Sequence, residues 1–232
     1  FMVILGTVSF CGLGAGPLAR YLGLSDPDPQ GILFIGADPW TRELAQVLTK
    51  HRVPVLLLDS NFANFSAARM AGLNAQCVNA LSEHVQESLE LAGMGRVMAV
   101  TPNDEVNTLA THEYLRFFPR SHLYQLPFRG KSSARWQTLS ETRRGRPLFD
   151  SEATSVDLNR KFAEGCVIKS TPLTEAFTLK DFYEMHGEDS VIMMAVGADN
   201  RLKVRTSQTP FNCVPGDSVI AMVSKKDQPL VS

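Results

Sequence analysis

The chain has 232 residues, of which 44% are hydrophobic and 20% are charged, and its formal net charge is −1 at pH 7. This length and apolar content suffice to bury a core in one or two globular domains, which excludes a disordered tail. The near-neutral charge argues against a nucleic-acid-binding protein held by phosphate contacts, because such proteins usually carry a basic face.

The cysteine and histidine residues form no metal-binding or disulfide pattern. The four cysteines lie far apart and include no CxxC pair, which favours a reducing compartment. The five histidines show no HExxH spacing. We therefore expect no metal site.

Residues 1–19 contain no charged side chain, and Arg20 follows them. At a rise of about 1.5 Å per residue, a helix of this length nearly spans a hydrocarbon core of roughly 30 Å. We predict that residues 1–24 are the end of a transmembrane helix, with the following residues on the cytoplasmic side. A signal peptide and a glycine-rich buried helix are the alternatives. Residues 25–30, with two prolines, are predicted to be a short linker.

From residue 31, apolar segments of strand length alternate with helical periodicity. The segments are apolar at nearly every position, which predicts a parallel sheet covered on both faces, in a doubly wound α/β domain over residues 31–128. The predicted strands are residues 31–36, 53–59, 74–79, 96–101 and 122–127.

Ligands of such sheets bind beyond the carboxyl ends of the strands, so the residues that follow each strand are the candidate binding residues. They are Gly36, Asp38, Asp59, Asn79, Thr101, Asn103, Asp104 and Asn107. Asp59 stands about twenty residues after the first glycine, where an acidic residue binds ribose hydroxyls. Its alternative role is to cap the helix that begins near Phe62.

Asp38 and Pro39 match an N-cap followed by proline at the first helical position. We expect the Asp38 carboxylate to accept the free amide hydrogens of this helix, which are the donors that a pyrophosphate would use. The carboxylate would therefore take the place of the ligand anion. Thr101 and Pro102 repeat the pattern before the next helix, with Thr101 as the expected cap.

Residues 129–147 have six basic side chains and one acidic side chain without sustained periodicity, and they are predicted to be a basic linker. Solvation and contact with anionic lipid are both open for this segment. Residues 148–232 are predicted to form a smaller α+β domain. It comprises a helix over 154–165, a strand over 166–172, a helix over 178–187, a hairpin over 190–206 and a final strand within 215–223.

The segments "ILFIGA", "VLLLDSN", "ARMAGLNAQ" and "LELAGMGRVMAVTPNDEVN" together make residues 31–128 resemble the TrkA-N domain, also called the RCK or KTN domain. This resemblance implies a Rossmann-like fold and a regulatory role in potassium channels and cation transporters. The last third, with "PGD" before its final strand, resembles a divergent TrkA-C domain.

Gly36 matches the first glycine of the family and Asp59 its acidic residue, but Asp38 and Thr41 replace the second and third glycines, and "VNAL" around Asn79 departs from the family pattern. These departures argue against binding of NAD or NADH. AMP, bound through Asp59 and the loop after the fourth strand, is the alternative regulatory ligand.

Residues 6–24 resemble the last transmembrane helix of bacterial sodium/proton or potassium/proton antiporters. The resemblance implies a non-enzymatic, homodimeric regulatory region of a monovalent cation:proton antiporter in the inner (plasma) membrane, with residues 25–232 cytoplasmic and the transport residues upstream. The partner is the antiporter's membrane domain on the same polypeptide. The alternative is a soluble NAD(P)-dependent oxidoreductase, for which the doubly wound fold is the only support.

Overall fold

The computed structural model describes residues 3, 4, 7, 8, 28–83, 89, 91–128, 144–187 and 189–225. The predicted end of a transmembrane helix, residues 1–24, therefore lies outside the described residues except at four positions. Most of the predicted basic linker lies outside them too. Over the described ranges, no helix combines the length and the apolar composition needed to cross a membrane.

The first sheet is fully parallel, with the strand order β3-β2-β1-β4-β5-β6. Its strands are β1 (Gly31–Ile35), β2 (Val55–Asp59), β3 (Ala75–Cys77), β4 (Met94–Ala99), β5 (Leu123–Gln125) and β6 (Arg146–Pro147). All five residues of β1 are buried, as expected for a central strand covered on both faces. The five predicted strands and the doubly wound class are confirmed, and β6 adds a sixth strand at the end of the predicted linker.

Helices cover both faces of this sheet. The apolar faces of α2 (Pro39–Lys50) and α3 (Phe62–Met70) pack on one side, in the same cluster as Ile32 and Phe34. The helix α5 (Asp104–Glu113) and the 3-10 turn η1 (Tyr114–Arg116) pack on the other side, with Leu33 and Ile35. A second 3-10 turn, η2 (Arg120–His122), leads into β5.

The second sheet is antiparallel, with the order β7-β10-β8-β9. It consists of β7 (Val167–Pro172), β8 (Val191–Val196), β9 (Leu202–Val204) and β10 (Ser218–Val223), and its helices are α6 (Ser155–Ala163) and α7 (Leu179–His186). Thr178 and Asp181 form a capping box at the start of α7, and Gly187 ends this helix with a φ of 73°. The predicted order of helices and strands in this region is confirmed.

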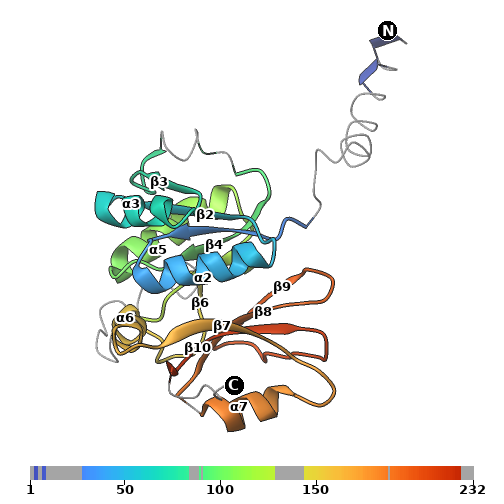
Figure 1. The fold of residues 1–232 in the computed structure, drawn as a ribbon. Coiled ribbons are helices and arrows are strands. Elements are labelled where there is room, and N and C mark those ends of the chain that lie inside the picture. The colour runs from blue at the N-terminus through green and yellow to red at the C-terminus, as the bar shows by residue number, and fades with distance from the viewer. Residues whose placement is uncertain are drawn as a thin grey trace.

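The two sheets share helix α2 as a common layer. The largest apolar cluster joins Ile32 and Phe34 of the first sheet, through Leu44 and Leu48 of α2, to residues of the second sheet such as Ile220. Figure 1 shows α2 between the two sheets and α7 on the outer face of the second sheet. Helix α5 packs on the opposite face of the first sheet from α2. A displacement of α2 must therefore change the packing of both sheets, because close-packed cores transmit strain.

Candidate functional site

The turn after β1 lies directly against the turn after β4. Gly36 has a φ of +110°, a conformation that favours glycine. A Cβ atom at this position would lie 3.1 Å from the backbone nitrogen of Thr101. The glycine is thus required both by its backbone conformation and by the close approach of two strand ends.

Asp59, at the end of β2, binds the neighbouring turn rather than capping a helix. Its carboxylate accepts hydrogen bonds from the amide of Ala37 at 2.9 Å, from the amide of Asn61 at 2.8 Å and from the side chain of Asn64 at 3.0 Å. The N-cap of α3 is Asn61, whose side chain accepts from Ala63. The capping alternative for Asp59 was therefore wrong, and the carboxylate fixes the turn after β1.

Asp38 occupies the predicted N-cap position of α2, with Pro39 following it, but its carboxylate makes no capping hydrogen bond. Our prediction that this carboxylate binds the amides of the helix start was wrong. It instead accepts a hydrogen bond of 2.9 Å from the side chain of Asn159 in α6. The reason is tertiary, since α6 brings a donor to this turn that the local sequence does not contain.

A second contact from the C-terminal region reaches the same turn. Trp40, in the first turn of α2, is fully buried, and its ring lies 6.4 Å from that of Phe149 in an edge-to-face arrangement. Such pairs contribute about 0.5–1.5 kcal/mol beyond their buried area. The start of α2 is therefore held by an apolar contact and by a polar contact, both from the C-terminal region.

The turn after β4 is closed by its own amide side chain. Asn107, which is fully buried, accepts hydrogen bonds from the Thr101 amide at 2.9 Å and hydroxyl at 2.7 Å, and donates to the Thr101 carbonyl at 2.9 Å. The N-cap of α5 is Asn103, which accepts from the amides of Glu105 and Val106. Thr101 was therefore wrongly predicted as the cap. The helix begins at Asp104, two residues after Pro102, the predicted first helical residue.

The structure brings only part of the predicted set together. Gly36, Thr101 and Asn107 meet where the turns after β1 and β4 adjoin, and Asp59 joins them through Ala37. Asn79 follows β3 at the edge of the sheet, and its side chain accepts from Leu81 within its own turn. Asp38 faces α6, as described above.

At this sheet edge, side chains of the protein itself bind backbone amides of the turns. The amide of Ala37 is bound by Asp59 and the amide of Thr101 by Asn107. A diphosphate approaching the start of α2 would compete with Asp59 and meet the Asp38 carboxylate, and both effects oppose its binding. The Ala37 and Thr101 amides are therefore already engaged within the protein.

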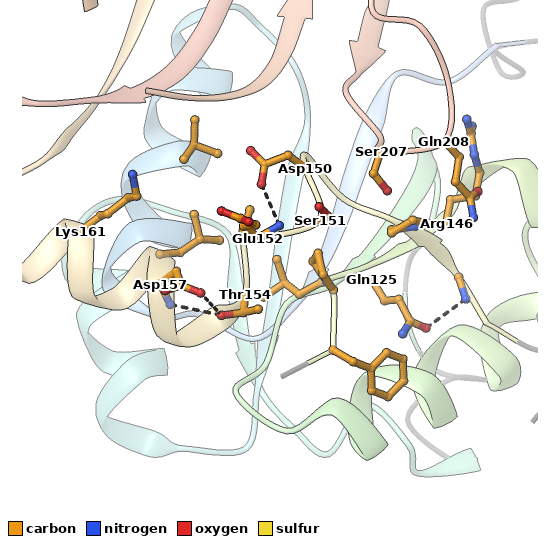
Figure 2. Close-up of a pocket in the computed structure, with 18 of the residues that line it drawn as sticks. Gln125, Arg146, Asp150, Ser151, Glu152, Thr154, Asp157, Lys161, Ser207 and Gln208 are labelled. Carbon is orange, nitrogen blue, oxygen red and sulfur yellow. Dashed lines mark hydrogen bonds between the residues drawn. The ribbon is translucent and has the colours of Figure 1, made fainter. Parts of the chain in front are cut away.

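A large cavity lies elsewhere, between the β5 and β6 ends of the first sheet and helix α6 (Figure 2). Its volume is about 1060 Å³, and none of the eight predicted residues lines it. Residues of the cavity wall come from both regions of the chain, including Gln125 from β5, Arg146 from β6 and Asp157 from α6. Sequence reasoning about strand ends missed this cavity because it depends on how the two regions pack.

The sequence carried weak signals for two of the missed residues. Asn159 follows Leu158 and lies four residues after Ser155, so it falls on the buried stripe of α6. Gln125 interrupts an apolar strand and is only 2% exposed. A polar residue at such a position predicts a specific hydrogen-bonding partner.

None of the curated proteins with which the sequence was compared matches it. Among solved structures, the TrkA-N domain of the inner membrane protein ybaL from Escherichia coli is 15% identical, with a TM-score of 0.36 over 44% of this chain and 73% of that chain. The GsuK channel bound to NAD is 13% identical, with a TM-score of 0.43 over 98% of this chain.

The NAD(P)-binding domain of an exopolyphosphatase-related protein from Archaeoglobus fulgidus is 20% identical, with a TM-score of 0.42 over 58% of this chain and 96% of that chain. This chain spans 44% of the length of the GsuK channel chain. The family model of the TrkA-N domain matches residues 32–124, which run from β1 into β5. The chain therefore contains a TrkA-N domain, built on its parallel sheet.

Proposed function

We propose that this chain is the regulatory region of a monovalent cation:proton antiporter and that it changes the exchange rate when a ligand binds. The TrkA-N domain and the uncharged segment at residues 1–19 support this proposal. In this proposal the region is cytoplasmic, non-enzymatic and homodimeric, and the membrane domain on the same polypeptide is its partner.

The observation that carries the regulatory part is the position of α2. Its first turn adjoins the carboxyl edge of the parallel sheet, and its length packs against the second sheet and α6. A ligand that binds one position of this helix better than another shifts the population of domain arrangements by its difference in affinity. Helix α2 is thus the element that such a ligand would bias.

Three polar contacts join α2 and its two flanking residues to the C-terminal region along the whole helix. Asp38 accepts from Asn159 at 2.9 Å, Glu43 accepts from the amide of Ile168 at 3.0 Å, and His51 lies 2.7 Å from the hydroxyl of Ser170. Ile168 belongs to the edge strand β7, so no neighbouring strand accepts a hydrogen bond from its amide on the outer side of the sheet. The Glu43 carboxylate accepts that hydrogen bond instead. In this proposal, the contacts couple a displacement of α2 to α6 and to the second sheet.

AMP is the regulatory ligand that we favour over NAD or NADH, because the pyrophosphate position is opposed by Asp38 and Asp59. The adenosine part would contact the turns after β2 and β4. Calorimetric titration of the chain with AMP, ATP, NAD and NADH tests this choice. Micromolar affinity for NADH would overturn it, and hydride transfer to a small substrate would favour the oxidoreductase alternative.

The transport role is tested in inside-out membrane vesicles from cells that express the gene encoding this chain. A preset proton gradient should dissipate when sodium or potassium is added, and the Glu43→Gln substitution should change the ligand concentration that gives half the maximal effect by about fivefold, which corresponds to about 1 kcal/mol of coupling. Glu175→Gln, at an exposed acidic position, is the matched control. Absence of cation-dependent dissipation with the unaltered gene would refute the antiporter assignment.

A further inference from the structure

The cavity of Figure 2 has the size and construction of a small-molecule site. Its volume of about 1060 Å³ is slightly above the range of ligand pockets, which is about 300–1,000 Å³. The first sheet supplies one wall, and the loop over residues 150–154 together with α6 supplies the opposite wall. Such a position between two packed regions is where ligand sites often occur.

The charges on these two walls have opposite signs. The wall formed by the first sheet and η2 carries three arginines and no carboxylate among its described residues. The opposite wall carries Asp150, Glu152 and Asp157. Figure 2 shows Asp150 and Glu152 on one side of the cavity and Arg146 on the other.

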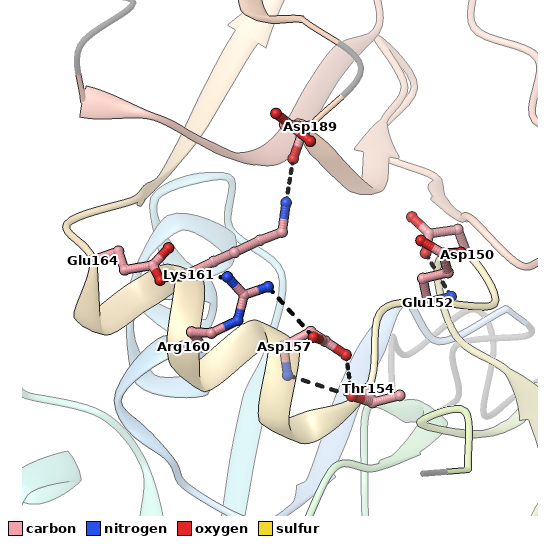
Figure 3. Close-up of polar contacts among 8 residues, drawn as sticks. All are labelled: Asp150, Glu152, Thr154, Asp157, Arg160, Lys161, Glu164 and Asp189. Atoms are coloured by element: carbon pink, nitrogen blue, oxygen red, sulfur yellow. Dashed lines mark hydrogen bonds and ion pairs between the residues drawn. The ribbon is translucent and has the colours of Figure 1, made fainter. Parts of the chain in front are cut away.

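The acidic side also carries two cations, Arg160 and Lys161, whose contacts Figure 3 shows. Arg160 pairs with Asp157 at 3.5 Å and with Glu164 at 3.3 Å. The ammonium group of Lys161 donates to the backbone oxygen of Asp189 at 2.6 Å. These contacts hold both cations along α6 and away from the loop carboxylates.

The carboxylates of Asp150 and Glu152 consequently have no ion-pair partner within the described ranges. Asp150 accepts a hydrogen bond from the amide of Glu152 at 3.0 Å, which stays inside the loop. On the facing wall, Arg146 donates to the carbonyl of Ser121 at 3.2 Å and to the hydroxyl of Thr209 at 3.2 Å. Its partners are neutral oxygens, so its positive charge is not compensated by any described carboxylate.

Gln125 adds an amide donor to the basic side of the cavity. Its side-chain oxygen accepts from the amide of Gly145 at 3.0 Å and from the hydroxyl of Thr111 at 3.3 Å. Its amide nitrogen has no hydrogen-bond partner in the described part of the chain, although the residue is only 2% exposed and lines the cavity. An amide nitrogen at the cavity surface without a protein partner offers a donor to a ligand.

We propose that this cavity binds a zwitterionic small molecule of the amino-acid class. The carboxylate of the ligand accepts from the Gln125 amide and lies near Arg146, and its ammonium or guanidinium group binds Asp150 and Glu152. A multiply charged anion is disfavoured by the two free carboxylates, and a simple amine leaves Gln125 unpaired. This binding site goes beyond the transport role, and direct binding to the purified chain tests it independently of that role.

The test is a thermal-shift screen of the intact chain with the twenty amino acids, followed by calorimetry of the best one. L-Lysine is compared with cadaverine, which lacks the carboxylate, and with hexanoate, which lacks the ammonium groups. We expect at least one amino acid to bind with a Kd below 1 mM, on the order of −4 kcal/mol or better. Cadaverine and hexanoate should bind at least about tenfold more weakly than L-lysine, which corresponds to about 1.4 kcal/mol.

Two substitutions locate the site. Gln125→Glu keeps the acceptor for Gly145 and removes the amide donor, and Glu152→Gln removes an exposed carboxylate at the opposite wall; each should weaken binding at least about tenfold. Glu175→Gln, outside the cavity, should leave the Kd unchanged. If Gln125→Glu fails to fold, the Kd of the Glu152→Gln variant alone tests the location of the site. The proposal is overturned if no amino acid binds at 10 mM, roughly −3 kcal/mol. It is also overturned if AMP or hexanoate binds as tightly as the best amino acid, or if neither substitution changes the Kd.

Discussion

The hydrogen bond between Asp38 and Asn159 can be measured with a double-mutant cycle of Asp38→Ala and Asn159→Ala. The donor and acceptor are 2.9 Å apart, and the acceptor is a carboxylate. Hydrogen bonds to charged groups contribute about 1.5–3 kcal/mol. Both side chains are half-buried, so solvent screening should lower the coupling energy to about 1 kcal/mol.

Urea unfolding of the four proteins, followed by circular dichroism, gives the free energies of unfolding. A single transition is expected, because one apolar cluster runs through α2 into both sheets. In the Asn159→Ala background, Asp38→Ala should cost about 1 kcal/mol less than in the unaltered protein. A control cycle that pairs Asp38→Ala with Glu175→Gln should be additive. Equal costs of Asp38→Ala in both backgrounds would refute the contact and restore the capping role.

Three further outcomes are expected. Asp59→Asn should lower the free energy of unfolding by about 2 kcal/mol, because the charged acceptor of two amides is lost. Glu175→Gln should leave this free energy unchanged. Urea unfolding would contradict the prediction if Asp59→Asn also left it unchanged. Tyr114→Phe should stabilise the protein by about 1 kcal/mol, since the buried hydroxyl has no partner among the described residues. Burial raises the pKa of Tyr114 from 10.0 to about 12, so the unaltered protein should lose stability as pH rises between these values, and the Phe variant should lack this loss. Burial raises the pKa of the Cys213 thiol to about 11, and the negative charge of Asp217 adds a smaller effect in the same direction. Iodoacetamide should therefore label the exposed Cys77 faster than Cys213 at pH 8.5. Faster labelling of Cys213, measured by mass spectrometry, would contradict this.

The turn after β1 separates what was predictable from what was not. The sequence predicted Asp38 before Pro39 at the start of α2, and the helix begins there. The direction of the carboxylate was wrong, because Asn159 lies 121 positions away and competes for it. A local pattern specifies which backbone groups need partners, but not which distant side chain will supply them.

Asp59 and Thr101 show the same division. Their places at strand ends follow from the apolar segments before them, so the sequence placed them at the carboxyl edge of the sheet. Their hydrogen bonds depend on β1 lying between β2 and β4, which sets the Ala37 amide beside Asp59. The caps of the following helices then fall to Asn61 and Asn103.

The sequence by itself determined the alternation of strands and helices, the parallel character of the first sheet and the start of α2, because these depend on side chains within a few residues of one another. Only the tertiary structure decided that α2 serves as a shared layer between two sheets and that a cavity with oppositely charged walls opens beside Gln125. The physical reason is that the pattern of apolar residues predicts which face of a helix or strand is buried. Which surface covers that face depends on the packing of segments more than one hundred residues apart.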